Sequence, residues 1–149
     1  MSAESDSPLR NLADTVKGYL GPAEVETDLG VEEIMTALGN RRRRLAVKAV
    51  AQSEDILDIG GLSETVGAME LGKPRAQVTS TERKRYYVGM YQTHLPRLED
   101  AGVVVVERNG GVRPGENLEA ATAVLRAVES LVGADDCGAG PVGGECRGE

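Results

Sequence analysis

The side chains best suited to a chemical role lie between positions 83 and 97, where cations stand beside groups that donate and accept hydrogen bonds. They are Arg83, Lys84, Arg85, Tyr86, Gln92, Thr93 and Arg97. Arginine and lysine neutralise phosphates, whereas Gln, Thr and Arg side chains can bond to the edges of bases. These residue types at this density predict binding to double-stranded DNA.

Enzymatic chemistry is not expected from this chain. Its only histidine, His94, has neither a cysteine nor a serine near it in the sequence. One imidazole without such a neighbour makes neither a catalytic triad nor a histidine-rich metal site. We therefore predict no enzyme activity, no metal and no cofactor, and we interpret His94 as structural, with a pH switch as the alternative. The existence of a small-molecule effector stays open.

Two cysteines are too few for a disulfide framework, which favours the reducing cytoplasm as the compartment. Cys137 and Cys146 flank eight residues rich in glycine, and they are read either as free thiols or as a redox-sensing pair. No apolar run approaches the roughly 20 residues of a membrane span. The first six residues are acidic and polar, unlike a signal peptide.

The formal net charge of −7 argues against nucleic acid until the charge is mapped along the chain. Residues 33–52 contain five bases and one acid, and residues 73–98 contain six bases and one acid. These two stretches carry +4 and +5, which indicates an anion-binding surface or, alternatively, solvated helix faces. Arginine supplies 13 of the 17 bases. Excess acid with little lysine is typical of proteins from salt-loving cells, although a GC-rich genome also favours arginine.

A helix over about 80–101 must position the candidate residues. Thr79 and Glu82 have the spacing of a capping box at its start. Its predicted apolar stripe is Val88, Tyr91, Leu95 and Leu98, which leaves Arg85, Tyr86, Gly89, Gln92, Thr93 and Arg97 on the outward arc. Pro96 predicts a kink or a break. Gly89 indicates either a close approach to the backbone or mere tolerance of a small residue.

The elements around this helix are predicted from apolar spacing and caps. A helix begins at Val31 and pauses at Gly39, and Asn40 caps the next one. A short strand over 56–59 leads into a helix capped by Asp58. After the long helix, a hairpin at about 103–114 turns at Asn109-Gly110-Gly111, with Arg108 and Arg113 on either side as further DNA contacts.

A last helix, capped by Asn117, carries apolar residues at heptad spacing. They are Leu118, Ala121, Leu125, Val128 and Val132. We interpret this seam as a homodimer contact, with a short helix at Leu9–Leu20 as the alternative. The predicted organisation is an acidic extension with a short helix (1–28), a main domain (29–115), the C-terminal helix (116–133) and a disordered Gly-rich tail (134–149).

Three blocks of the sequence carry a family resemblance. They are Leu38–Arg44 (LGNRRRR), Arg83–Tyr87 (RKRYY) and Tyr91–Val104 (YQTHLPRLEDAGVV). Over about residues 29–113 the chain resembles a haloarchaeal winged-helix domain family, and the resemblance implies a winged-helix fold and a role in transcription regulation. The last block is also similar to the junction of recognition helix and wing in MarR and ArsR regulators, from which the chain departs by its Pro96.

The order of elements is itself that of a winged helix-turn-helix, mainly α with a small β-hairpin and with extra N- and C-terminal helices. In that fold the third helix lies in the major groove and the hairpin reaches the flanking backbone. The rival interpretation is a winged helix that contacts only protein, because a fold does not decide a function.

Overall fold

The computed structural model describes residues 25–133, and its first two helices begin where the sequence predicts. Helix α2 spans Val31–Leu38 and α3 spans Arg41–Gln52. The Asn40 side chain accepts hydrogen bonds from the first backbone N–H groups of α3, as predicted. The Leu9–Leu20 helix, the Gly-rich tail and both cysteines lie outside the described residues.

The short strand β1, Leu57–Asp58, leads directly into α4, Ile59–Leu71. The Asp58 carboxylate accepts a hydrogen bond of 2.6 Å from the Gly61 N–H, which confirms the predicted cap. Helix α4 ends at Gly72, whose φ of 69° is left-handed and therefore suits glycine. A single 3₁₀ turn, η2, follows at Arg75–Gln77.

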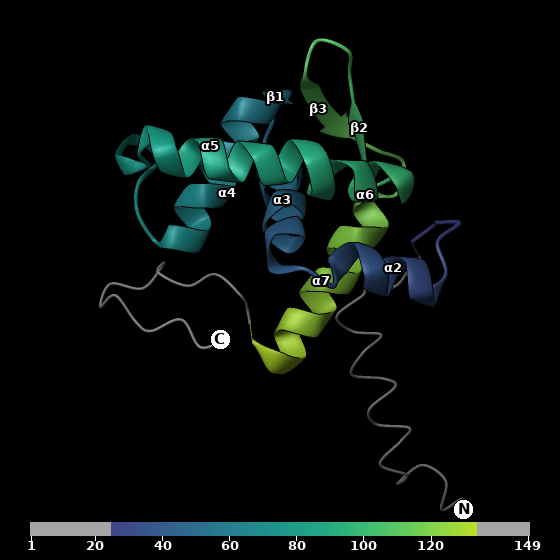
Figure 1. Ribbon diagram of the computed structural model, residues 1–149. Helices are drawn as coiled ribbons and strands as arrows, with labels where there is room; N and C mark the ends of the chain where they lie inside the picture. The colour runs from purple at the N-terminus through teal and green to yellow at the C-terminus, as the bar shows by residue number, and fades with distance from the viewer. Residues whose placement is uncertain (1–24, 134–149) are drawn as a thin grey trace, which may run out of the picture.

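One continuous helix then crosses the front of the molecule (Figure 1). It consists of α5 (Ser80–Gly89), the π-turn η3 (Met90–His94) and α6 (Leu95–Asp100). We call these three segments the long helix. Its capping box forms as predicted, since Thr79 Oγ1 accepts from the Glu82 N–H and Glu82 Oε1 accepts from the Thr79 N–H.

The helix does not break at Pro96, which was one of the two outcomes predicted there. The Leu95 N–H donates to the carbonyl of Met90, five residues back, and the backbone stays helical on both sides. This wider turn lies directly before the proline, which has no N–H of its own to continue the ladder. The π-turn therefore lets the helix pass through Pro96 without ending.

The wing is a hairpin of β2, Val104–Val106, and β3, Gly111–Pro114. Strand β3 lies in the middle of a three-stranded antiparallel sheet in the order β1-β3-β2. Leu57 is paired with Val112 across the sheet. In the turn, which forms at the predicted Asn109-Gly110-Gly111, Gly110 has a positive φ of 89°.

Helix α7, Leu118–Val132, packs on α3 at the back of the domain. This packing corrects the predicted dimer seam, because Leu118, Ala121 and Leu125 belong to the core of the monomer. Only Val128 and Val132 of the seam are exposed, and Leu131 joins them. Asn117 does not cap α7; its side chain instead bonds to Ala101 O and to two residues before α2.

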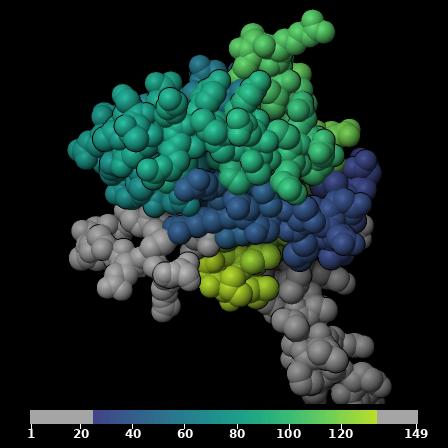
Figure 2. Space-filling model, viewed as in Figure 1, coloured from purple at the N-terminus to yellow at the C-terminus, as the bar shows by residue number. Residues whose placement is uncertain are grey.

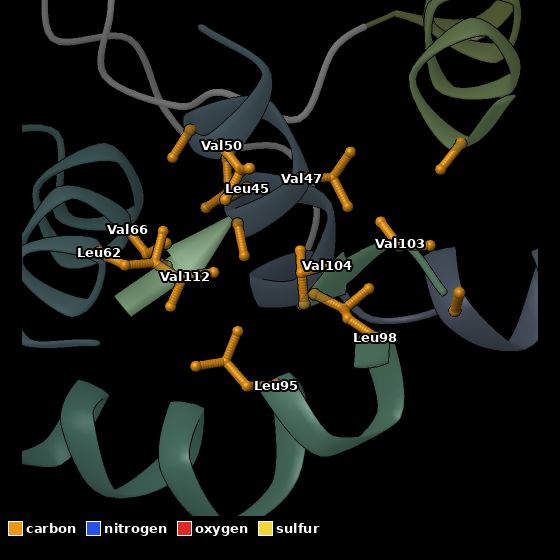
Figure 3. Packing of buried hydrophobic residues seen from close by; sticks show 14 of the residues in the cluster. Leu45, Val47, Val50, Leu62, Val66, Leu95, Leu98, Val103, Val104 and Val112 are labelled. Atoms are coloured by element: carbon orange, nitrogen blue, oxygen red, sulfur yellow. The ribbon is translucent and has the colours of Figure 1, made fainter. Parts of the chain in front are cut away.

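Aliphatic side chains from every layer meet in one core, shown in Figure 3. Helix α3 contributes Leu45 and Val50, and the sheet contributes Val104 and Val112. Leu95 of the long helix closes the core from the front.

These elements make a helix-rich winged helix-turn-helix with a small antiparallel sheet, as predicted. Helices α3, α4 and the long helix are its three helices, and β2–β3 is its wing (Figure 1). No helix within residues 25–133 combines the length and apolar character needed to cross a membrane.

Candidate nucleic-acid interface

The long helix carries four rows of side chains, each spaced by four residues. The buried row is Tyr86, Met90, His94 and Leu98. The outermost row, opposite the buried one, is exposed throughout and consists of Lys84, Val88, Gln92 and Pro96. Two further rows lie between the buried and the outermost row. One is Arg83-Tyr87-Tyr91, and the other is Arg85-Gly89-Thr93-Arg97. Figure 2 shows this segment, in teal and green, on the same face as the wing above it.

Tyr86 corrects the predicted outward arc, because its side chain is only 3% exposed. The Tyr86 hydroxyl donates a hydrogen bond of 2.6 Å to Glu70 Oε1, and Arg42 Nε donates to the same oxygen. The Arg42 guanidinium also lies 4.4 Å from the centre of the Tyr86 ring. Burial, and then the bond to Glu70, raise the pKa of Tyr86 to about 12. Tyr86 therefore attaches the long helix to α3 and α4 and does not face solvent.

His94, the last residue of the π-turn, is also buried. Its Nδ1 lies 3.5 Å from Nη1 of Arg43. Because a guanidinium only donates hydrogen bonds, Nδ1 accepts and the ring proton lies on Nε2. Burial lowers the pKa of His94, and the charges of Arg43, Arg42 and Arg97 lower it further. This supports the structural interpretation of a neutral His94.

Most cations of the first basic stretch form contacts inside the fold. Arg43 and Arg44 donate to three backbone carbonyls in the last turn of α2, at 2.7–2.9 Å. Lys48 Nζ lies 2.7 Å from Glu129 Oε2 on α7. These contacts, with the Arg42–Glu70 pair, satisfy carbonyls and acids of neighbouring helices. The +4 stretch therefore positions the helices and is not the anion-binding surface that its charge indicated.

The second basic stretch does present exposed cations. Arg83, Lys84 and Arg85 are exposed in the first turns of the long helix, and none of the three forms an ion pair within residues 25–133. A Cβ at Gly60 would lie 2.7 Å from Nη2 of Arg83. The Arg83 guanidinium therefore lies over the start of α4, on the flank of the long helix that faces β1 and the sheet.

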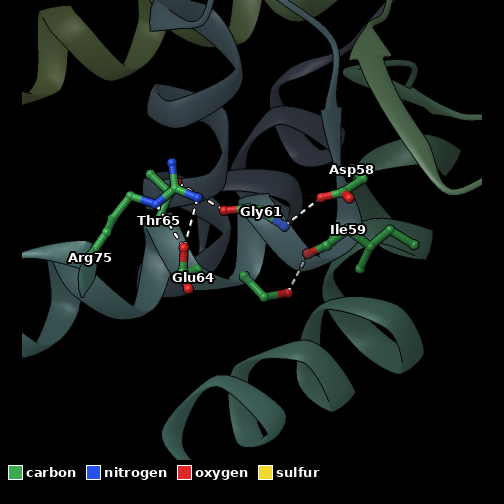
Figure 4. A network of polar contacts seen from close by, with 7 residues as sticks. Asp58, Ile59, Gly61, Glu64, Thr65 and Arg75 are labelled. Atoms are coloured by element: carbon green, nitrogen blue, oxygen red, sulfur yellow. Dashed lines mark hydrogen bonds and ion pairs between the residues drawn. The ribbon is translucent and has the colours of Figure 1, made fainter. Parts of the chain in front are cut away.

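Two further cations of this stretch, Lys73 and Arg75, lie in the turn between α4 and the long helix, where each forms an ion pair. Arg75 of η2 donates two hydrogen bonds to Glu64 Oε1 of α4, at 2.8 and 3.1 Å (Figure 4). Lys73 Nζ lies 2.7 Å from Glu82 Oε1. The hydrogen bond from Lys73, with that from the Thr79 backbone, lowers the pKa of Glu82. These contacts link the turn to both helices and so set the position of the exposed cations.

At the wing, Arg108 is exposed beside the hairpin turn. Arg113, which was predicted to contact DNA too, donates instead to Glu107 Oε2 at 2.8 Å. Glu107 largely compensates the charge of Arg113. Arg108 is therefore the main cation that the wing presents to an anion.

Arg97 lies on the opposite flank from Arg83. With Glu32, Glu33 and Asp100 it lines a cleft of about 340 Å³ between α2 and α6. Fourteen residues along a helix span about 21 Å, so Arg83 and Arg97 do not contact the same few base pairs. Gly89, on this flank, is not required by packing, since a Cβ there would meet only His94, at 3.7 Å.

Sequence reasoning missed Tyr87, Val88 and Tyr91 as surface residues. Their exposed fractions are 40%, 41% and 59%, and the two tyrosine rings stack with their centres 6.1 Å apart. The i, i+4 spacing of the two tyrosines is the signal that could have indicated a shared face.

Comparison with known proteins gives one family. Residues 35–113, more than half of the chain, match the model described as Domain of unknown function (DUF7344). The chain belongs to this family. No curated protein and no solved structure matches it.

Proposed function

We propose that this member of the DUF7344 family is a DNA-binding transcription regulator acting in the cytoplasm. The long helix would enter the major groove, and the wing would lie on the flanking backbone. The observation that carries the proposal is the exposed trio Arg83, Lys84 and Arg85 on the third helix of a winged helix-turn-helix. Gln92 and Thr93, exposed two turns further on, add groups that can bond to base edges.

The test is binding of the full chain to labelled DNA duplexes, followed by fluorescence anisotropy over a range of salt concentrations. Arg83→Ala is expected to weaken binding to all sequences alike, whereas Arg85→Ala and Gln92→Ala are expected to change sequence preference. Arg126→Ala, which removes an exposed charge from α7 instead, is the matched control and should bind as the wild type does. Genome-wide occupancy of the tagged protein then identifies its targets.

The rival function is contact with another protein, and the exposed side chains Tyr87, Val88 and Tyr91 favour it. The same anisotropy measurement separates the two. A chain that retains no duplex at any salt concentration while a partner protein co-purifies with it is an interaction module, and the regulator proposal is then wrong.

We further propose a homodimer that reads two half-sites. The contact would use the exposed end of α7, where Val128, Leu131 and Val132 lie outside the core. Leu131→Glu should turn a dimeric mass in light scattering into a monomeric one without loss of helicity. A monomeric mass for the wild type at micromolar concentration contradicts the dimer.

A further inference from the structure

The exposed side of the long helix changes character along its length. Arg83, Lys84 and Arg85 lie at its start, and the hydrogen-bonding side chains Gln92 and Thr93 lie beyond its middle. Between them is an apolar patch that we define as Tyr87, Val88 and Tyr91. The helix therefore offers cations, then apolar surface, then hydrogen-bonding groups, in that order.

The patch is exposed because other residues of the long helix face the core. Tyr86 and Met90 fill the inner positions, so Val88 points to the opposite side and Tyr87 and Tyr91 lie on the flank shared with Arg83. The two tyrosine rings are nearly parallel, with 13° between their planes. Their mutual contact holds an apolar surface in place before anything binds.

Duplex DNA offers such a surface one apolar partner in the major groove. The C5-methyl group of thymine is the only apolar group on the base edges there, and the adenine opposite it is the base that a glutamine bonds with two hydrogen bonds. Val88 and Gln92 are one turn apart, about 6 Å. That distance is under two base-pair steps of about 3.4 Å.

We propose that the middle of the long helix reads A·T base pairs, with Val88 and Tyr91 against thymine methyl groups and Gln92 on adenine. This inference rests on the proposed function and names the base pairs that the same helix would read. Charge complementarity argues for duplex DNA as the occupant, because the patch adjoins three exposed cations without acidic partners in the described part of the chain. Arg83 and Lys84 would hold the phosphates while the patch meets the bases.

The test begins with selection of preferred sites for the full chain from a random duplex library. A·T pairs are expected at the centre of each half-site. Thymine in that site is then replaced by uracil, which removes the methyl group and keeps every base-pairing and groove hydrogen bond. Each contacted methyl should contribute about a fourfold difference in the dissociation constant.

Variants assign that difference to the patch. Val88→Ala and Tyr91→Ala should reduce the discrimination between thymine and uracil, whereas Tyr91→Phe should keep it. Val31→Ala removes an equally apolar, exposed side chain from α2 and should leave both affinity and discrimination unchanged. All three positions are exposed, so circular dichroism should report a folded protein for each of the four variants.

The outcomes are distinct. Equal affinity for thymine and uracil sites, with binding retained, overturns the A·T inference and leaves the proposed function standing. No binding to any duplex overturns both. A change of mass in light scattering for Tyr91→Ala, with the thymine preference intact, shows that the patch is a protein contact and also overturns the inference.

Discussion

Individual polar side chains attach the long helix to the rest of the domain. Glu70 Oε1 accepts from both Tyr86 and Arg42, and Arg43 donates to His94 and to α2. Each of these groups is wholly or partly removed from water, so each hydrogen bond replaces one that solvent supplied. Two of the four side chains in the buried row of the long helix, Tyr86 and His94, are polar, and both have hydrogen-bond partners.

Replacing Tyr86 by phenylalanine removes the hydroxyl that bonds to Glu70 and keeps the ring over Gly67 and beside Arg42. The free energy of unfolding should fall by about 1.5 kcal/mol, the typical contribution of a hydrogen bond to a charged group. Urea unfolding followed by circular dichroism measures it. Tyr87→Phe is the control: its hydroxyl is on an exposed residue, and a similar loss there would contradict the assignment.

Stability should also depend on the protonation of His94. The folded state lowers its pKa, so below about pH 6.5 the unfolded chain binds a proton that the folded chain does not. Arg43, Arg42 and Arg97 oppose the charged form, and the charge of Glu70 favours it. The free energy of unfolding should therefore be highest above this pH and decrease as the pH falls through it.

The control is His94→Asn, whose side-chain oxygen can accept from Arg43 as Nδ1 does. Urea midpoints of the variant should change much less over the same pH range. The chain has only one histidine, so equal pH dependence in both proteins would assign the effect to groups other than an imidazole.

At the scale of elements, α4 and α5 pack closely together at Gly67, where a larger residue would meet the Tyr86 ring. A Cβ at Gly67 would lie 3.0 Å from Cδ2 of the Tyr86 ring, which Glu70 and Arg42 hold in place. Gly67→Ala should therefore destabilise the fold by about 1–2 kcal/mol through overpacking, in spite of the better helix propensity of alanine.

Gly60→Ala, in the same helix, is the matched comparison. The added Cβ would crowd the end of the flexible Arg83 side chain, which can move away, and would lie at an ordinary contact distance of 3.7 Å from Asp58 Oδ1. Its unfolding free energy should stay within about 0.5 kcal/mol of the wild type. Equal losses for the two variants would mean that helix α4 tolerates no side chain at either position, whatever lies opposite it.

Most element boundaries were predictable because their causes are local. Asn40, Asp58 and Thr79 bond to backbone groups two or three residues away, so the sequence contains both partners at a fixed spacing. The inner face of the long helix was not predictable in this way. Tyr86 and His94 are buried because Glu70 and Arg43 satisfy them, and those partners are 16 and 51 residues away.

The same limit explains the candidate site and the predicted dimer seam. Arg83 and Lys84 were identified because charged side chains are mostly exposed. Arg113 was wrongly expected to be available because its partner, Glu107, lies on the other side of the hairpin. The heptad spacing of α7 indicated an apolar stripe correctly. It did not say that α3 of the same molecule covers the first half of that stripe.

For the molecule as a whole, an excess of acid coexists with a cationic front. Arg42, Arg43, Arg44 and Lys48 of the first basic stretch bond to acids or carbonyls inside the fold, so they add little positive charge to the surface. Arg83, Lys84, Arg85 and Arg97 of the long helix and Arg108 of the wing are exposed. Non-specific attraction should be weak, and at molar salt, where the Debye length is about 3 Å, base contacts would dominate affinity.

This charge distribution predicts the salt dependence of DNA binding. Three phosphate contacts per protomer, from Arg83, Lys84 and Arg108, give a slope of about −2.7 in a plot of log K against log salt concentration. Arg108→Ala should reduce the slope by about 0.9, and Arg126→Ala on α7 should not change it. Titrations by anisotropy between low and physiological salt measure the slope, and an unchanged slope for Arg108→Ala would exclude a phosphate contact by the wing.

The π-turn at Met90–His94 also bears on how the chain tolerates changes in length. A wider turn contains one residue more than an ordinary one, so deleting one residue from 91–93 would restore regular spacing while both halves of the helix kept their core contacts. A deletion anywhere else in the helix would rotate one half by about 100° relative to the other. Relatives that differ in length by a single residue here could therefore keep the same core and the same wing, and differ only in which side chains meet the DNA.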